Sequence, residues 1–248
     1  MDDAPGIPTQ PRVHLTFDID WAPDWAVSDV LSLLSETNTP ATFFVTHKSA
    51  MIDEIRAGGH HIGIHPNFLP ETTQGSGWTN IVGSLLELCP DASSMRTHAL
   101  VQATPLLETI VNAFPQIQYD MSLFTPTLPS CGLIPWHINS AVLTRINYHW
   151  EDDICFYVPD HDWHVLQLSG PITILDYHPI HLALNSTDGS EYQALKRLLG
   201  HRHLYDVTPE EVATVAEYTV AGTRTHFLQL LSSDLKILSF MDLLCELE

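Results

Sequence analysis

Apolar β-branched runs alternate along this chain with segments in which apolar residues recur at helical spacing. Short apolar runs predict buried strands, and a spacing of three and four residues predicts amphipathic helices. The predicted strands are Val13–Phe17, Ala41–Val45, His61–Ile64, Met95–Ala99, Val142–Asn147, Ile172–Tyr177 and Lys236–Phe240. The predicted helices are Trp25–Ser35, Asn80–Leu88, Pro105–Ala113, Glu191–Leu199, Thr208–Val220 and Thr223–Leu231. Strands interleaved with helices in this way indicate an α/β fold whose parallel sheet forms an open or closed barrel.

The segments between these elements have the sequences of helix caps and loops, not of linkers between domains. Thr208 precedes Pro-Glu-Glu, which is the sequence of a helix N-cap followed by proline at the first helical position. The Pro-rich stretch Thr125–Pro135 has the composition of a long surface loop. The chain shows no internal repeat and no low-complexity linker, so we expect a single domain over residues 1–248 with residues 1–11 flexible.

Charge and composition exclude several classes of protein. The chain carries 10 Lys and Arg against 30 Asp and Glu, a formal charge of −20, yet 44% of its residues are hydrophobic. Such apolar content predicts a folded chain, and the acidic balance argues against nucleic acid or an anionic membrane as partner. The longest apolar runs are too short to span a membrane. The acidic N-terminal stretch lacks a signal-peptide pattern and the four cysteines form no CxxC pair, so we expect a cytoplasmic protein with reduced thiols.

Two carboxylates follow the first predicted strand. Asp18 and Asp20 stand at i and i+2, which an extended chain places on one face. Two acids so close repel each other unless a cation or a shared proton intervenes. A divalent metal with one carboxylate as ligand and the other as base is one solution, and a solvated strand end is the other.

Histidine is abundant in this chain, with 15 residues, and three of them lie near the third predicted strand. His61 and His65 share a strand face and His60 takes the other. Neutral imidazole is a common zinc ligand, and His65 has the best position because it ends the strand.

Two more predicted strands end in polar groups. Arg96 and His98 end the fourth, where a guanidinium can hold a carboxylate and an imidazole can bind a metal or a hydrogen-bond partner. Asp176 and His178 end another, a pairing that orients an imidazole and adjusts its pKa. The role of His181, three residues later, stays open. Because strand ends meet at one end of a barrel, these groups together predict an active site there.

Other polar groups carry weaker signals. His47 follows the Ala41–Val45 strand and is a candidate to line the site. The segments Trp150–Asp153 and Asp160–His164 are acidic and aromatic, and we expect solvated loops there rather than contacts to a sugar or an amine. His201 and His203 have the position of a helix C-terminus, where cationic side chains suit the helix dipole.

These clusters, taken in order, resemble the motifs of the polysaccharide deacetylase family, also called the NodB-homology or carbohydrate esterase four domain. The resemblance runs from about residue 12 to residue 180 and is closest to a WbmS-like branch associated with bacterial surface-glycan gene clusters. The matching segments are Thr16–Asp20 for TFDDG, Ala41–Val45 for ATFFV, Gly59–His65 for GHEIGNH, Arg96–Ala99 for Arg-x-Pro-Tyr and Asp176–His178 for Leu-x-His.

The resemblance implies a fold, a cofactor and a set of roles. The fold is a distorted (β/α)7-type barrel. Asp18 is implied as general base, and Arg96 as the group that orients it. Asp20 and His65 are implied as metal ligands. His178 is implied as the acid that protonates the leaving amine. The implied cofactor is a divalent metal, with zinc expected, which polarises the amide carbonyl and binds the attacking water. A backbone N–H near the Tyr position of the family motif, Ala99 here, is implied as an oxyanion donor.

The chain departs from the family pattern at three positions. Leu69 stands where the family commonly has a second histidine, His98 replaces the Pro of Arg-x-Pro-Tyr, and Asp176 replaces the Leu of Leu-x-His. We infer that His98 supplies the third ligand that Leu69 cannot, which gives two imidazoles and one carboxylate with an open position. His61 and Asn67 are the alternatives for this third ligand.

The expected activity is hydrolysis of a carbon–nitrogen bond other than a peptide bond. The chain would remove an acetyl or formyl group from a nitrogen on a sugar, in surface-polysaccharide biosynthesis. Because we expect a cytoplasmic protein, the expected substrate is a nucleotide-linked or lipid-linked sugar. One alternative is an amidohydrolase of a small nitrogenous metabolite, and another is a member that binds glycan without cleaving it. The sequence leaves open the sugar, the acyl group, the metal and the oligomeric state.

Overall fold

The computed structural model describes residues 10–138 and 141–248, and residues 1–9 of the N-terminal segment expected to be flexible lie outside the described part. The strands are β1 (Arg12–Asp18), β2 (Thr42–Val45), β3 (His61–Ile64), β4 (Ser94–Met95), β5 (Tyr119–Phe124), β6 (Leu133–Ile138), β7 (Ala141–Tyr148), β8 (Trp150–Glu151), β9 (Ile172–Tyr177) and β10 (Lys236–Leu238). The helices are α1 (Asp24–Glu36), α2 (Met51–Ala57), α3 (Trp78–Leu88), α4 (Thr104–Ala113), α5 (Asp152–Cys155), α6 (Pro179–Leu184), α7 (Ser190–Leu199), α8 (Pro209–Ala213), α9 (Thr223–Leu231) and α10 (Phe240–Leu247). Short 3-10 turns span His98–Leu100 and Leu204–Asp206.

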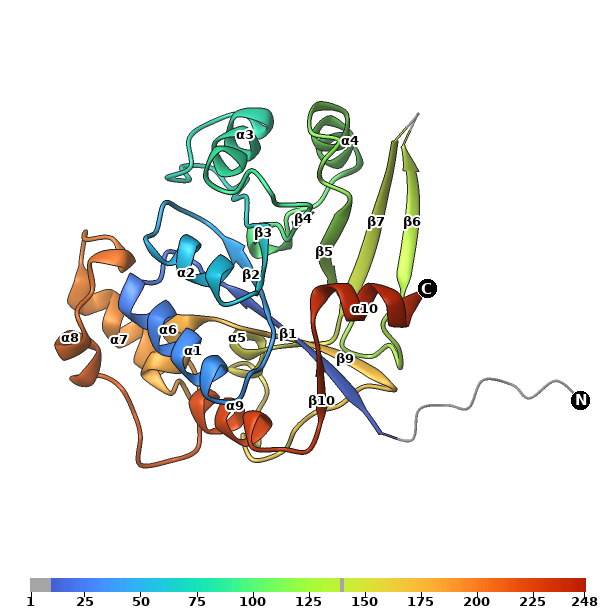
Figure 1. Ribbon diagram of the computed structural model, residues 1–248. Helices are drawn as coiled ribbons and strands as arrows, with labels where there is room; N and C mark the ends of the chain where they lie inside the picture. Colours follow the sequence, from blue (N-terminus) through green and yellow to red (C-terminus); the bar gives the residue numbers. More distant parts are fainter. Residues whose placement is uncertain (1–9, 139–140) are drawn as a thin grey trace, which may run out of the picture.

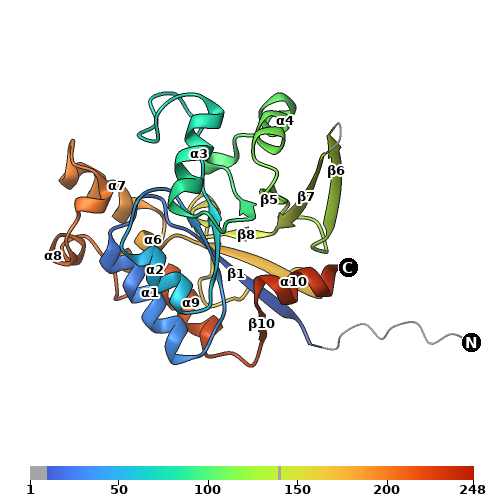
Figure 2. The same cartoon turned by 45° about the horizontal axis from the view of Figure 1, so that its top comes forward.

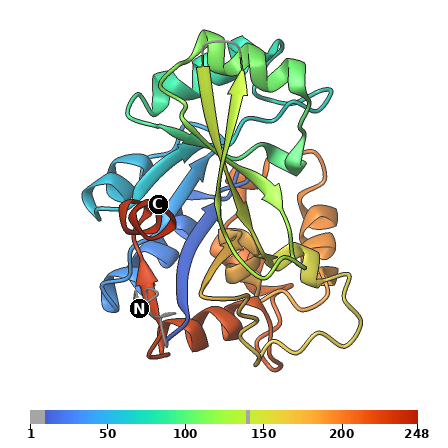
Figure 3. The same cartoon turned by 90° about the vertical axis from the view of Figure 1, so that its right-hand side faces the viewer.

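The strands form one sheet that curls strongly but stays open (Figures 1 and 3). Its order is β6-β7-β5-β4-β3-β2-β1-β9-β8, and every pair is parallel except β6 with β7. The curl brings β7 into contact with β9, while the end strands β6 and β8 form no ladder with each other in the described residues. The fold is therefore α/β with a half-barrel sheet, the open form of the predicted barrel.

Strand β1 is the centre of this sheet and divides one of its edges between two partners. Its first residues, Arg12–His14, pair with β10, and its last, Thr16–Asp18, pair with β2. Its other edge pairs along most of its length with β9. β1 is buried almost throughout, as expected for a central parallel strand.

Helices cover the outer face of the curled sheet. Helix α1 packs against α2 and α6, α6 packs against α9, and α3 packs against α4 (Figures 1 and 2). The buried stripe of α1 consists of Ala26, Val27, Val30 and Leu34, which follow the spacing of an amphipathic helix. Each fully buried Val or Leu contributes about 1.5–3 kcal/mol relative to exposure in water.

Helix α10 covers the end of the half-barrel at which the strands begin. Its first residue, Phe240, stacks on His61 with ring centroids 3.9 Å apart and meets Tyr119 edge-on at 5.4 Å. His14, near the start of β1, lies 6.2 Å from the same ring. With this end filled by Phe240, the carboxyl ends of the strands are left for polar groups.

Three predicted elements are longer in the prediction than in the structure. The strand predicted over Met95–Ala99 ends at Met95, because the chain turns into the 3-10 turn at His98. The strand predicted over Lys236–Phe240 ends at Leu238, because Ser239 caps α10. The helix predicted over Thr208–Val220 ends at Ala213, and the chain beyond it is tied to α6 by a hydrogen bond from Glu217 N to Leu184 O (3.1 Å). The Thr208 N-cap itself is confirmed as a complete capping box.

Several helices and strands of the structure were not predicted from the sequence. The expected loop Thr125–Pro135 is wrong at its end, because β6 begins at Leu133 and pairs with β7. Pro135 lies in this strand, which is possible because an edge strand leaves one side unpaired. The strands β5 and β8 and the helices α5, α6 and α10 were also not predicted. The four cysteines are free thiols, and no helix in the described ranges is long and apolar enough to cross a membrane.

Candidate active site

The structure brings the predicted polar groups together at the carboxyl ends of neighbouring strands. Asp18 ends β1, Asp20 follows it, His65 follows β3 and His178 follows β9. His98 lies in the turn after β4. Because β4, β3, β2, β1 and β9 are consecutive in the sheet, these strand ends face a common space.

Asp20, His65 and His98 form a compact triangle of donor atoms. Asp20 Oδ1 lies 3.1 Å from His65 Nε2 and 3.1 Å from His98 Nδ1, and the two nitrogens are 3.2 Å apart. If all three contacts were hydrogen bonds, three protons would be needed. The two ring nitrogens carry at most two, and the ionised carboxylate carries none. At least one pair of donor atoms therefore has no proton between them, and a bound cation would satisfy all three atoms at once.

The dimensions of the donor triangle fit a divalent transition metal. Ligands about 2.0–2.1 Å from zinc lie about 2.9–3.4 Å from one another for octahedral to tetrahedral angles. The three observed edges fall inside that range. His65 is buried, while the side chains of His98 and Asp20 keep 23% and 20% of their exposure, so one side of the triangle is accessible. Two imidazoles and one carboxylate with an open side make a suitable zinc or iron donor set.

A strained turn aims Asp20 into this triangle. Asp20 and Trp21 both have left-handed backbone angles, with φ of 45° and 57°. For non-glycine residues such angles cost about 1–2 kcal/mol each, and they concentrate at functional sites. The turn is held by hydrogen bonds from Ile19 N to Phe44 O (3.1 Å) and from Ala22 N to Ile19 O (2.8 Å).

The histidine contacts fix the charge of Asp20 and His98. Burial alone would raise the pKa of Asp20, but the contacts with His65 and His98 hold that pKa well below its usual range. Burial alone would lower the pKa of His98, and the Asp20 carboxylate raises it instead. Asp20 is thus an ionised, anionic vertex of the donor triangle.

Arg96 is a fully buried cation that holds two carboxyl groups. Its guanidinium lies between the rings of Phe44 and Tyr148, 4.6 and 4.4 Å from their centroids. Nη1 donates to Asp18 Oδ1 at 3.0 Å and also contacts Asp176 Oδ1. Burial opposes the charge, but the two carboxyl groups raise the pKa of Arg96 above its ordinary value. Arg96 therefore fixes the orientation of Asp18.

Asp18 and Asp176 differ in their surroundings although they share this guanidinium. Asp18 Oδ2 lies 3.5 Å from His65 Nε2 and so borders the donor triangle. Asp176 is fully buried, and its Oδ2 has no hydrogen-bond partner among the described residues. Burial raises the pKa of Asp176 well above its ordinary value, although Arg96 acts against this shift. Burial thus favours the protonated form of Asp176.

His178 is held by an aspartate that the sequence analysis did not single out. Asp152 Oδ1 lies 2.6 Å from His178 Nδ1, and Asp152 Oδ2 accepts from His178 N at 2.9 Å. Burial would lower the pKa of His178, but Asp152 raises it well above its ordinary value. His178 Nε2 faces Asp20 Oδ2 at 3.6 Å. His178 is thus an imidazolium at neutral pH that borders the donor triangle.

The expectation of a solvated loop over Trp150–Asp153 is wrong. Trp150 is 3% exposed and Asp152 is fully buried, because β8 pairs with β9 and α5 starts directly after it. Tyr148 donates to Glu151 Oε2 at 2.5 Å, and burial raises the pKa of Glu151 to about 8. The sequence feature that could have identified Asp152 is its position: it is an acidic residue that starts a helix directly after the strand that begins with Trp150.

Two other carboxylate–histidine groups can be drawn from the described residues. One joins Asp18, Asp176 and His178, and the other joins Glu151, Asp153 and His178. Both depend on His178, whose Nδ1 is bound to Asp152. The Asp20–His65–His98 group is the better donor set, because its three donor atoms lie 3.1, 3.1 and 3.2 Å apart and one side of it is accessible.

The remaining sequence candidates lie apart from the donor triangle. His61 contacts Ser94 Oγ at 2.9 Å and stacks on Phe240 at the opposite end of β3, and Asn67 Oδ1 accepts from Leu69 N at 2.9 Å. His181 is buried edge-on against His178, with ring centroids 5.5 Å apart, and burial lowers its pKa to about 3. His61 therefore does not reach the donor triangle, and the Asn67 side-chain oxygen is used by Leu69 N.

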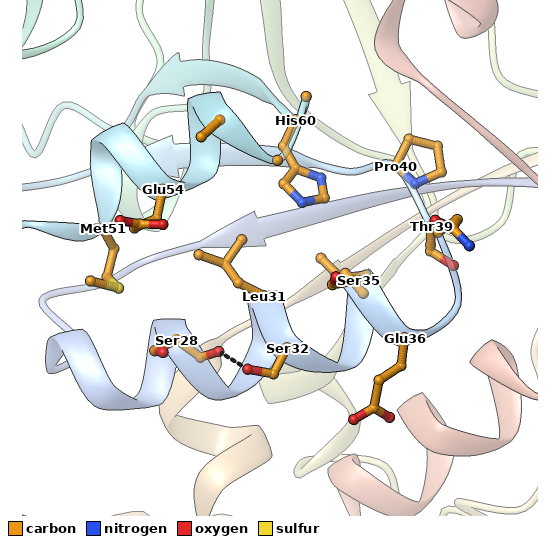
Figure 4. A pocket seen from close by; sticks show the side chains of 15 residues that line it. Ser28, Leu31, Ser32, Ser35, Glu36, Thr39, Pro40, Met51, Glu54 and His60 are labelled. Atoms are coloured by element: carbon orange, nitrogen blue, oxygen red, sulfur yellow. Dashed lines mark hydrogen bonds between the residues drawn. The ribbon is translucent and has the colours of Figure 1, made fainter.

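A large groove on the described surface is remote from these groups. It measures about 1000 Å³ and lies between α1 and α2 (Figure 4). Leu31 and Ser35 of α1 and Met51 and Glu54 of α2 face it, and His60 lines its end. Its lining shares no residue with the donor triangle, so its size does not make it the active site.

The chain is similar to one protein-family model and to several solved structures. A family model described as WbmS-like polysaccharide deacetylase matches residues 15–196. WbmS from Bordetella bronchiseptica, described as a candidate polysaccharide deacetylase involved in O-antigen biosynthesis, is 33% identical with a TM-score of 0.74 over 90% of each chain. The peptidoglycan N-acetylglucosamine deacetylase Bc1960 is 14% identical with a TM-score of 0.47, over 94% of this chain and 87% of its own. A family 4 acetyl xylan esterase from Clostridium thermocellum, in complex with cobalt, is 16% identical with a TM-score of 0.44, over 94% and 90%. A search of curated proteins finds no match.

Proposed function

This chain belongs to the WbmS-like polysaccharide deacetylase family, and from that membership and the site geometry we propose that it is a metal-dependent hydrolase of N-acylated sugars. It would cleave the amide bond between an acetyl or formyl group and a sugar nitrogen. Its relative WbmS is described as involved in O-antigen biosynthesis, which supports a surface polysaccharide or its precursor as substrate.

The observation that carries the proposal is the position of two proton-transfer groups at different corners of one donor triangle. The Asp18 carboxylate borders the His65 corner at 3.5 Å, and the His178 imidazolium borders the Asp20 corner at 3.6 Å. Amide hydrolysis needs a base for the attacking water and an acid for the leaving nitrogen. The two groups supply both beside one candidate metal site.

Asp20, His65 and His98 would hold the metal. A divalent cation such as Zn²⁺ bound there supplies Lewis acidity, which polarises an amide carbonyl and lowers the pKa of water. The three side chains come from three different strand ends, and Asp20 is ionised before any metal arrives. The chain thus offers an anionic, partly open donor set.

Asp18 would act as the base. Arg96 and the ring sandwich around it fix the Asp18 carboxylate, so Oδ2 stays directed to the donor triangle. In the reaction Asp18 takes a proton from water as the water oxygen bonds to the acyl carbon. Arg96 is a positioning residue, because its fork is occupied by carboxyl groups and it touches no substrate position.

His178 would act as the acid. Its Nδ1 is occupied by Asp152, which leaves Nε2 to donate a proton to the sugar nitrogen as the carbon–nitrogen bond breaks. The products are the free carboxylic acid and the amino sugar. The raised pKa of His178 keeps that proton available at neutral pH.

The activity is tested with zinc-loaded protein and a panel of N-acetylated and N-formylated sugars, their oligomers and small ureides. We expect release of acetate or formate from at least one acylated sugar and loss of that release with a chelator. We expect Asp18→Asn to lower turnover at least about 100-fold, because the base is lost. The exposed control Asp234→Asn keeps full activity.

Three outcomes would contradict the proposal. Metal-loaded protein that binds acylated sugars but releases no acid is a silent glycan-binding member of the family. Hydrolysis confined to the ureides identifies a small-metabolite amidohydrolase. Full turnover in Asp18→Asn shows that another group is the base.

A further inference from the structure

The turn that carries His98 lies beyond its strand and has an unusual backbone. Strand β4 ends at Met95, and His98 begins a 3-10 turn shortly after it. The next two residues, Ala99 and Leu100, both have left-handed backbone angles, with φ of 51° and 52°. Non-glycine residues keep such angles only where the surrounding structure holds them. The position of the His98 ring therefore depends on what holds this turn.

Ser122 of β5 holds the chain on both sides of the turn. Its hydroxyl oxygen accepts a hydrogen bond from Thr97 N at 2.9 Å, directly before His98. Its carbonyl oxygen accepts from Gln102 Nε2 at 2.6 Å, just after the turn. Thr97 and Ser122 are fully buried, so water does not compete for the first of these bonds. One residue of the neighbouring strand thus fixes both the entry and the exit of the turn.

An irregularity in the strand pairing frees Ser122 for this role. The register between β5 and β7 shifts between Asp120 and Leu123, as it does at a β-bulge. Ser122 N donates to Asp120 Oδ1 at 3.1 Å, and Ser122 O accepts from Gln102, so side chains satisfy both of its backbone groups. Bulges are common beside active sites, where they redirect a side chain. Here the redirected side chain is Ser122, which points to the turn of His98.

The charged groups around Ser122 fix the direction of its hydrogen bonds. Ser122 Oγ donates to Asp120 Oδ1 at 2.5 Å, and Arg145 Nε donates to Asp120 Oδ2 at 2.7 Å. A hydroxyl carries one proton and a carboxylate only accepts, so the Ser122 proton points to Asp120 and its lone pairs are left for Thr97 N. Arg145 Nη2 also donates to Gln102 Oε1, and Gln102 returns to Ser122 O. The hydrogen bonds thus close a cycle that holds the Ser122 side chain and backbone together.

Strand β5 also supports the proposed base. Met121 O accepts from Arg96 Nε at 3.1 Å, and Arg96 is the residue that orients the base. Neighbouring residues of one strand thus support both this guanidinium and the turn of His98. Because Asp20 follows β1 and His65 follows β3, a shift of the His98 turn would move one donor atom of the triangle and leave the other two in place.

We propose that Ser122 is a positioning residue for metal binding, because it holds the His98 ring at the donor triangle. His98 stands where the family pattern has proline, so the proposed third ligand of this chain comes with a support of its own. Removal of a side chain that orients a metal ligand typically weakens metal binding by about 10–100-fold. The inference rests on the proposed function and extends it, since it names a residue outside the donor triangle that the metal site requires.

The zinc affinity of the metal-stripped protein, measured by competition with a chromophoric chelator, tests this inference without catalysis. We expect Ser122→Ala to weaken zinc binding at least about tenfold and to change the absorption spectrum of the Co²⁺-loaded protein, because the His98 ring is no longer held. The matched control Ser94→Ala removes another fully buried hydroxyl, 2.9 Å from His61 Nε2, and keeps zinc affinity within about twofold. Gln102→Ala truncates an exposed side chain, so we expect unchanged thermal unfolding and zinc binding weakened about threefold.

A double variant shows whether Ser122 acts through His98. In the His98→Ala background, Ser122→Ala is expected to weaken zinc binding by no more than about twofold, because the ligand that it positions is gone. Equal weakening with and without His98 overturns the inference, as does zinc affinity in Ser122→Ala within about twofold of wild type. A loss in Ser94→Ala as large as that in Ser122→Ala also overturns it. If Ser122→Ala does not fold, wild-type affinity in Gln102→Ala overturns it instead.

This inference and the proposed hydrolase fail in distinguishable ways. Zinc binding that Ser122→Ala leaves unchanged refutes the role of Ser122 and leaves the hydrolase standing. Zinc binding that depends on Ser122, without release of acid from any acylated sugar, refutes the hydrolase and leaves the role of Ser122 standing. A wild type that binds no zinc refutes both.

Discussion

At the scale of single residues, two aspartates share one guanidinium and yet differ in chemistry. Asp18 borders the donor triangle, whereas Asp176 is enclosed on every side and has a raised pKa. Two buried carboxyl groups beside one buried guanidinium favour uptake of a proton by one of them. We expect Asp176 to be that one, because burial raises its pKa, and Asp18 to be the partner that Arg96 holds as a carboxylate.

This difference predicts the effect of matched substitutions. Asp176→Asn replaces a neutral carboxyl by a neutral amide of the same shape, so we expect turnover within about threefold of wild type and little loss of stability. Asp18→Asn removes the base and is expected to lower turnover at least about 100-fold. The comparison is made by steady-state kinetics at pH 7 with both variants checked by thermal unfolding. Equal loss of activity in the two variants would contradict the assignment of Asp176 as the protonated partner.

The residues of the donor triangle were predictable from the sequence because each of them ends a short apolar run. The close approach of Asp20, His65 and His98 is what strand-end convergence predicts, although their role as ligands stays a prediction. Asp152 was missed because its partner His178 lies 26 residues away and no periodic pattern marks the segment.

At the scale of elements, the first turn of α5 contacts the end of β9 and holds it in position. Helix α5 is only four residues long, and Asp152 at its start accepts from both the backbone and the ring of His178. Helix α5 is too short to be stable alone, and the hydrogen bonds between Asp152 and His178 hold it in place. The same hydrogen bonds orient His178, the proposed acid. The strands β1, β3 and β9 were predicted almost to the residue because they are buried apolar runs. The strands β5, β6 and β8 were not, because edge and mixed-polarity strands lack that pattern.

The contact between α5 and β9 predicts a pH profile. The Asp152 carboxylate raises the pKa of His178, so activity that needs the imidazolium persists through neutral pH and falls only as pH rises past that pKa. Asp152→Asn removes the charge, and we expect the alkaline fall to move to lower pH by at least about one unit, with turnover at pH 7 reduced about tenfold or more. Rates measured from pH 5 to 10 check this. A lower rate with an unshifted profile would mean that Asp152 is merely structural.

At the scale of the whole molecule, the abundance of histidine has a structural as well as a chemical consequence. His14 and His226 are fully buried and lie outside the donor triangle, and burial lowers the pKa of each to about 4. His14 bonds to Leu238 O and Thr42 Oγ1, and His226 to the Tyr177 hydroxyl. These rings are neutral parts of the core.

Buried neutral histidines predict a fold that loses stability in mild acid. Their folded pKa of about 4 lies below the unfolded value of about 6.5, so between these values the unfolded chain binds more protons. The free energy of unfolding therefore falls as pH drops from about 6.5 to 4, by on the order of 3 kcal/mol for each histidine. Urea unfolding from pH 8 to 4.5 measures this. We expect a steep fall, a shallower one in His14→Gln and an unchanged one in the exposed control His201→Gln. A flat profile for the wild type would contradict the prediction.

The central claim is that Asp20, His65 and His98 hold one divalent metal, and metal stoichiometry tests it most directly. Wild type, His98→Ala and the surface control His203→Ala are stripped with chelator, reloaded with Zn²⁺, dialysed and analysed for zinc. We expect about one equivalent in the wild type and in His203→Ala, and less than about a tenth of an equivalent in His98→Ala, since loss of one of three protein ligands weakens retention severely. One retained equivalent in His98→Ala, or none in the wild type, would contradict the claim.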